Sequence, residues 1–167
     1  MFRSDPGRRR SWVALGAAAV SACAGVQNSP APDPAAALSE SVFDCNVQPI
    51  LVRQCSYSAC HGIAGSTGTG APLRVYSPGK LRATSAMTID QLIAPLTMDE
   101  QHANFESAAA FAWDLTSVDD NWLLRKPLPS IDGGYEHKGG AIWQGGTMDP
   151  QYVAIRAWLA NTGSCTP

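Results

Sequence analysis

Charged residues make up only 16 % of this 167-residue chain, whereas hydrophobic residues make up 45 %. No basic stripe with interleaved aromatic residues occurs, and the formal net charge is −2. Because nucleic-acid binding depends on Lys and Arg meeting phosphates, we expect no nucleic-acid partner. There is no internal repeat, and no Ser/His/Asp set, phosphate-binding loop or H-E-x-x-H motif indicates a known enzyme class. The length fits one domain.

Residues 1–22 have the organisation of an export signal. Four arginines lie within residues 3–10, and a short apolar run over residues 12–20 follows them. This order is typical of a secretory signal peptide, and the run is shorter than the roughly 20 residues that cross a bilayer. Since residues 1–22 hold four of the 12 basic residues and one of the 14 acidic residues, the rest of the chain has a net charge of −5.

The stretch Val20-Ser21-Ala22-Cys23 resembles the lipobox at which bacterial lipoproteins are cleaved and lipidated. The resemblance implies that Cys23 carries several acyl chains, which anchor a protein firmly to a membrane. Residues 23–37 are rich in Pro and Ala and predict a flexible tether. The residues directly after Cys23 are Ala24 and Gly25, not Asp, which favours the outer membrane. We therefore expect a lipid-anchored protein of the cell envelope that faces the periplasm.

Residues 38–167 predict a mostly α domain of short helices and long loops. Pro49 fits the first turn of a helix that starts near Gln48. Leu73 and Val75 alternate in the manner of a short strand. Three further helix starts are predicted by their caps, namely Thr88 with Gln91, Asp119 or Asp120 before Trp122, and Asp149 before Pro150. Gly163 predicts the end of the last helix.

Four cysteines remain beyond Cys23, at positions 45, 55, 60 and 165. The arrangement Cys55-x4-Cys60-His61 is two residues wider than C-x-x-C-H, the signal for covalent attachment of c-type haem. In that signal two thiols bond to the haem vinyl groups and the His becomes the proximal iron ligand. A longer bulge can still satisfy this geometry. We predict one haem c, held by Cys55 and Cys60 with His61 on the iron.

Other uses of these cysteines stay open at this point. An exported protein folds in an oxidising compartment, so Cys55 and Cys60 can instead belong to disulfides, with three connectivities among four cysteines. A zinc site would need four N or S ligands. If haem takes Cys55 and Cys60, Cys45 and Cys165 remain, and we predict a disulfide between them. Closing so long a loop contributes about 3–5 kcal/mol in the chain-entropy model.

Two blocks of the sequence resemble cytochrome c-like domains of exported proteins in planctomycetes and myxobacteria. The first is Val47-Gln-Pro-Ile-Leu51 with the later Cys60-His61-Gly62. The second comprises Leu123-Leu-Arg-Lys-Pro-Leu128, Gly133-Gly134, His137-Lys-Gly139-Gly140, Tyr152 and Trp158-Leu159. Together they cover both ends of residues 41–163, but not residues 63–120. The resemblance implies a small cytochrome c-like haem domain.

The second iron ligand has five candidates, which are Met87, Met98, His102, His137 and Met148. We favour His137, because surrounding glycines let a backbone approach a flat macrocycle closely. The related domains also have a His here, which in that group looks like the distal ligand. Met148 is the alternative, and a Met ligand would raise the haem potential.

These features predict a membrane-tethered monohaem protein for periplasmic electron transfer. Its partners would be a redox protein or a membrane electron-transfer chain. Because two axial ligands leave the iron no open position, we expect an electron carrier more than an enzyme. An exchangeable ligand would instead indicate a haem enzyme or sensor. The alternative of another class is a disulfide-stapled, non-haem lipoprotein that acts as a binding or structural module.

Overall fold

The computed structural model describes residues 37–62, 73–86, 88–112 and 115–165. The predicted signal peptide, Cys23, nearly all of the tether and Met87 lie outside these residues. The described residues are mostly helical, in short helices joined by loops, which confirms the mostly α fold class. No helix among them is long and apolar enough to cross a membrane.

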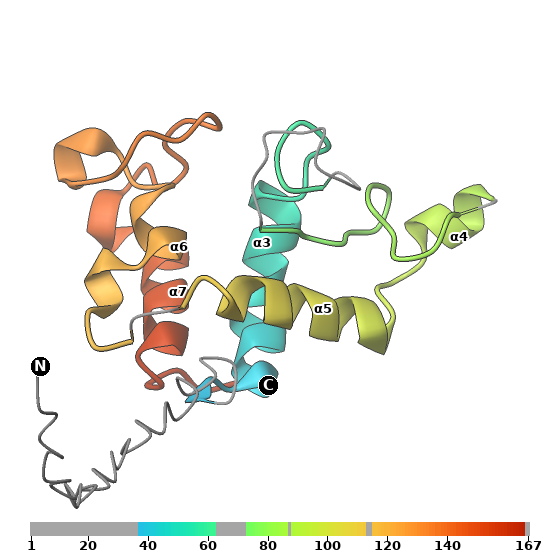
Figure 1. Cartoon of the computed structure of the whole chain (residues 1–167), viewed down its shortest axis with the longest axis horizontal. Helices are drawn as coiled ribbons and strands as arrows, with labels where there is room; N and C mark the ends of the chain where they lie inside the picture. Colours follow the sequence, from blue (N-terminus) through green and yellow to red (C-terminus); the bar gives the residue numbers. More distant parts are fainter. Residues whose placement is uncertain (1–36, 63–72, 87, 113–114, 166–167) are drawn as a thin grey trace, which may run out of the picture. The chain divides into compact units, whose positions relative to one another are not determined.

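The helices follow one another along the chain with short connections and several long loops (Figure 1). Alpha-helical segments are α2 (Glu40–Val42), α3 (Gln48–Gln54), α4 (Ile89–Ile93), α5 (Met98–Ala109), α6 (Trp122–Arg125) and α7 (Pro150–Leu159). Tighter 3-10 turns are η2 (Val118–Asp120), η3 (Ser130–Asp132) and η4 (Gly146–Met148), whereas η1 (Phe43–Val47) is a π-helical turn.

Helix α3 begins at Gln48 with Pro49 in its first turn, as predicted. The helical path also continues upstream, through the π-helical turn η1 to α2, where the Ser39 hydroxyl accepts from the Val42 amide at 3.3 Å. Proline has no amide hydrogen to donate back into the preceding turn. A widened turn just before Pro49, in which the Gln48 amide reaches Phe43 O, lets the chain stay helical across that gap.

Local capping explains where the later helices start. Thr88 and Gln91 form the predicted capping box of α4, and the Asp149 carboxylate accepts from the Gln151 amide at 2.9 Å to start α7. The predicted Asp cap of α6 is wrong. Asn121 caps that helix, accepting from the Leu123 amide at 3.0 Å, because Asp119 is engaged by Arg156 at 2.6 Å.

The strand predicted at Leu73 and Val75 is also wrong, and no strand forms within the described ranges. The amides of this segment bond elsewhere than to a second strand. The Val75 amide donates to His61 O at 2.9 Å, and the next amide, of Tyr76, donates to the Asn104 side chain at 2.6 Å. A loop and helix α5 therefore satisfy the backbone that a sheet would otherwise pair.

Helix α5 crosses α3 (Figure 1). It carries Asn104, whose side chain accepts from the Tyr76 amide. Asn104 is almost fully buried, and its amide group also donates to Gln48 Oε1 at 3.2 Å. The sequence of α5 is mostly polar, so hydrophobic periodicity did not predict this helix. Its buried apolar side chains are Phe105, Ala108 and Ala109. The Phe105 ring lies 5.7 Å from Phe43 and 6.3 Å from Trp158, so an aromatic cluster joins α5, η1 and α7.

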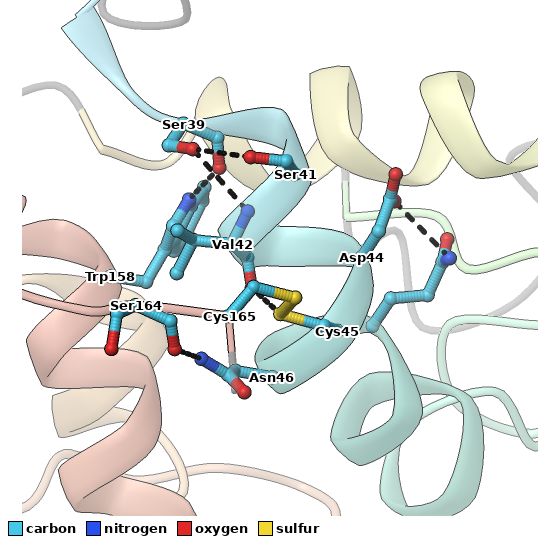
Figure 2. Close-up of a disulfide and its surroundings, with 10 residues drawn as sticks. Ser39, Ser41, Val42, Asp44, Cys45, Asn46, Trp158, Ser164 and Cys165 are labelled. Atoms are coloured by element: carbon cyan, nitrogen blue, oxygen red, sulfur yellow. Dashed lines mark hydrogen bonds between the residues drawn. A yellow bond between two sulfur atoms is a disulfide. The ribbon is translucent and has the colours of Figure 1, made fainter. Parts of the chain in front are cut away.

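The predicted disulfide between Cys45 and Cys165 is confirmed (Figure 2). The two Cα atoms are 5.9 Å apart, within the usual range for a disulfide, and the bond spans 120 positions of sequence. Beside it, the Asn46 side chain donates to Ser164 O at 2.9 Å, and the Trp158 indole donates to Ser39 O at 3.0 Å. The start and the end of the domain are thus held together by covalent and polar contacts.

Replacing both Cys45 and Cys165 with serine should lower the free energy of unfolding by about 3–5 kcal/mol, because the unfolded chain regains the entropy of a long open loop. Denaturant unfolding of the variant and the parent, both without reductant, measures the difference. Reductant added to the parent should produce the same loss, and an unchanged midpoint in both experiments would contradict this role.

A buried ion pair fixes the region before α5. The Arg82 guanidinium lies 2.8 Å from the Glu100 carboxylate and also donates to the carbonyls of Leu92 and Ala94. Hydrogen bonding to Arg82 lowers the pKa of Glu100 to about 2, helped by the amides of Ala83 and Thr97 and opposed by burial.

Because the folded pKa of Glu100 lies below its unfolded value, the stabilisation is fully present above about pH 4.5 and is lost as the pH falls toward 2. We expect the loss to reach about 3 kcal/mol. Unfolding free energies measured across this window should fall more steeply for the parent than for Glu100→Gln. Parallel profiles would show that the ion pair does not set the acid stability.

Candidate functional site

A largely apolar cavity of about 680 Å³ is lined by residues of the loop after α3 and of the loops between α6 and α7. These loops lie at one end of the helices (Figure 1). Cofactor sites typically have volumes of roughly 300–1,000 Å³. The cavity brings together the four residues predicted to hold the cofactor. Its full lining is Leu51, Cys55, Ala59, Cys60, His61, Leu73, Phe111, Trp122, Leu123, Lys126, Pro127, Glu136, His137, Lys138, Gly139 and Trp143.

The widened spacing between Cys55 and Cys60 is taken up by a closed loop. Cys55 ends α3, and the His61 amide returns to donate to Cys55 O at 3.2 Å. Within the loop, Tyr57 O accepts from the amides of Cys60 at 2.8 Å and Gly62 at 3.0 Å. The chain therefore bulges outward after Cys55 and comes back to it at His61.

Gly62 permits this closure. A Cβ atom at this position would lie 1.9 Å from Ser56 O, a distance that no side chain can adopt. The loop between the cysteines can fold onto itself only because Gly62 leaves that space to the backbone.

His61 is held in one orientation by the chain that follows it. Its Nδ1 lies 2.9 Å from Leu73 O, and because a carbonyl only accepts, Nδ1 carries the proton and Nε2 is bare. Burial lowers the pKa of His61, the hydrogen bond to Leu73 opposes this, and His137 lowers it further. The ring is therefore kept neutral, the form in which imidazole binds a metal.

His137 also directs its Nδ1 at a backbone carbonyl. Its Nδ1 donates to Gly140 O at 3.2 Å, because that carbonyl can only accept. Gly140 adopts a left-handed φ of 74°, and a Cβ atom on Gly139 would lie 2.9 Å from His137 Cε1. The glycines for which we favoured His137 as the second iron ligand therefore shape the turn and leave room for its imidazole.

The rings of His61 and His137 lie parallel within 11°, with their centroids 6.1 Å apart. Two imidazoles that share one metal have centroids roughly 6 Å apart, from metal–nitrogen bonds of about 2 Å and about 1 Å from each nitrogen to its ring centre. A carbonyl on the second nitrogen is the usual partner of a metal-bound histidine. The separation of the two rings is therefore compatible with both imidazoles holding one metal between them.

The two cysteines of the cavity differ in environment. Cys55 is buried, and that burial raises the pKa of its thiol to about 12, with Cys60 adding to the effect and Lys80 opposing it. Cys60 is half-buried beside His61. Within the described ranges, no three His, Cys, Asp or Glu side chains are grouped as ligands of a single metal ion.

The other candidate iron ligands lie elsewhere. Met148 and Met98 are 82 % and 84 % exposed, and neither lines the cavity. His102 sits on α5 between Glu40, at 2.7 Å, and Glu106, at 3.4 Å, and hydrogen bonding to Glu40 raises its pKa. Its environment is that of a solvated, charge-paired histidine.

The sequence alone does not show every contribution to the cavity. Leu73 contributes a backbone carbonyl, for which a sequence carries no signal. Trp143 is fully buried against the cavity, and its indole nitrogen has no hydrogen-bond partner in the described part of the chain. Lys126 lines the cavity, donates to Glu136 O at 3.2 Å and lies 5.3 Å from the ring centre of Trp122.

Comparison with protein-family models, with curated proteins and with solved structures finds no significant match to this chain.

Proposed function

We propose that this chain is an exported, lipid-anchored protein that holds one haem covalently and carries electrons. The observation that supports it most is the parallel pair of His61 and His137, 6.1 Å apart, in a cavity that also holds Cys55 and Cys60. Nothing in the linear spacing of these four residues required them to meet in one cavity.

The donor set suits haem c. Each thiol, of Cys55 and of Cys60, would add across one vinyl group, with sulfur bonding to the inner carbon and hydrogen going to the terminal carbon. This addition consumes no oxidant or reductant. The closed loop returns the backbone to Cys55 at His61, and both cysteines line the same cavity despite the longer spacing.

The imidazoles of His61 and His137 would hold the haem iron. Leu73 O and Gly140 O fix the protons on the two Nδ1 atoms, so each ring offers only its Nε2. With both axial positions taken, no position is open to a substrate, which favours an electron carrier over an enzyme. Two histidines should also give a lower potential than a His/Met pair.

The haem would supply a one-electron iron couple, and the protein supplies burial, orientation and charge. Apolar side chains line much of the cavity, among them Leu51, Leu123 and Phe111, and would shield a bound haem from water. Lys126 and Lys138 also line it and would pair with the haem carboxylates.

Anchoring and location belong to the same proposal and are supported by the sequence. A lipidated Cys23 followed by a tether would keep the domain at the envelope, facing the periplasm, most simply on the outer membrane. There it would exchange electrons with a redox protein or a membrane electron-transfer chain.

Intact-protein mass spectrometry tests the covalent attachment. The chain is expressed with haem-maturation machinery and denatured before measurement. We expect the mass of the protein plus one haem, and no haem on the variant that carries both Cys55→Ala and Cys60→Ala. A parent chain without haem, with Cys55 and Cys60 in disulfides, would instead support a stapled, non-haem lipoprotein.

A further inference from the structure

The segment from Leu73 to Leu81 holds the loop between the two cavity cysteines at two places. At one end of the loop, Leu73 O accepts from the His61 ring at 2.9 Å, and the Val75 amide donates to His61 O at 2.9 Å. These contacts fix the histidine. They do not reach the residues that make the loop longer than the usual haem-attachment signal.

Lys80 makes the second contact, on the bulge itself. Its ammonium donates to Ser56 Oγ at 2.9 Å and lies 3.8 Å from the ring centre of Tyr57. A cation over an aromatic face is attracted to it, most strongly where water is excluded. One side chain therefore holds the two residues that directly follow Cys55.

The Lys80 ammonium donates to a buried hydroxyl oxygen. Ser56 is fully buried, and its hydroxyl donates to Val52 O, so its oxygen is left to accept from Lys80. Without the ammonium, a buried lone pair loses its partner and the Tyr57 ring loses its cation. A loop with no regular structure of its own would then regain much of its conformational freedom.

Lys80 lies in a tight turn of the backbone. The Ser77 amide donates to Leu81 O at 2.9 Å, and the Lys80 amide donates to Ser77 O at 3.2 Å. Gly79 has a left-handed φ of 72°, which this turn requires and other residues rarely adopt. The position of Lys80 is thus set by its own turn, independently of the loop that it contacts.

We propose that Lys80 is a positioning residue, which holds the widened Cys55–Cys60 loop in the shape that lets both cysteines reach one haem. This inference rests on the proposed function. It assigns to the segment 73–81, outside both blocks of family resemblance, the task of compensating for the two additional residues.

The test compares Lys80→Met in two backgrounds, the natural loop and a loop shortened by deletion of Tyr57 and Ser58, which leaves the spacing C-x-x-C-H. In the natural loop, Lys80→Met should lower the ratio of haem to protein about fivefold or more. It should also leave part of the bound haem with one thioether, seen as a shifted α-band of the reduced pyridine complex. In the shortened loop the same substitution should change neither quantity.

Two further variants separate positioning from folding. Lys80→Arg keeps a cation for Ser56 and Tyr57 and should restore haem attachment. Arg74→Met removes an exposed cation from the same segment and should have no effect. Equal losses in both loop lengths, or no rescue by arginine, would overturn the inference, as would full attachment in Lys80→Met. An unmodified parent chain would instead refute the proposed function.

Discussion

Replacing His61 with alanine is expected to abolish stable haem incorporation, the largest effect of any single substitution in the chain. Of the two paired imidazoles, only that of His61 lies next to a cysteine that we propose to attach the haem, and its Nδ1 is already fixed by Leu73 O. Without it, a haem in the cavity would lose the ligand that the neighbouring thioether holds in place. Haem absorbance per protein, measured after purification, gives the result.

His102→Ala is the matched control for this experiment. That histidine contacts Glu40 and Glu106 on the surface and does not line the cavity, so haem content should match that of the parent. If His61→Ala retained a full complement of haem, His61 would not be the proximal ligand.

Replacing His137 with alanine should leave haem attached but open one side of the iron. The imidazole at 6.1 Å from His61 would be gone, while both cysteines and His61 remain. We expect the reduced variant to bind carbon monoxide stoichiometrically, whereas the reduced parent binds it weakly or not at all. Difference spectra of the reduced proteins with and without carbon monoxide measure this directly.

Met148→Leu controls for the alternative ligand. Met148 is largely exposed in the structure, so this variant should behave as the parent does. An unchanged six-coordinate spectrum in His137→Ala would show that the assignment of His137 is wrong. Carbon monoxide binding in Met148→Leu would then identify the methionine as the ligand.

The features that could be predicted from sequence are those that depend on neighbouring residues. The cap of α7 at Asp149 and the capping box of α4 involve side chains within three residues of the amides they satisfy. The Cys45–Cys165 bond was also predicted, because assigning Cys55 and Cys60 to haem left one pairing. Its two cysteines could be named without knowing how the chain between them folds.

The features that escaped prediction depend on contacts between distant segments. Helix α5 has a polar sequence, and it is anchored by Asn104, whose partners Gln48 and Tyr76 lie on other parts of the chain. Leu73 and Val75 alternate as in a strand, yet the Val75 amide donates to His61 O in a loop and the Arg74 amide donates to Ser107 Oγ on α5. Periodicity reports burial, but it does not report which backbone group will be the partner.

In the candidate site, too, features set by neighbouring residues could be predicted, whereas features set by distant contacts could not. That Cys55, Cys60, His61 and His137 are candidates for one site could be predicted from the sequence, and the structure places all four in one cavity. The parallel orientation of the two imidazoles, the carbonyls that hold their protons and the Lys80 contact on the loop could not. Each of these depends on a loop closing against a segment that is remote in sequence.

The measurement that tests the central claim most directly is a reduced pyridine haemochrome spectrum of the protein after extraction with acidic acetone. Our proposal predicts that haem stays with the protein and shows the α-band of haem with two thioether bonds, in a ratio of one haem per chain. Haem that passes entirely into the acetone, or a protein that never contained it, would contradict covalent attachment by Cys55 and Cys60.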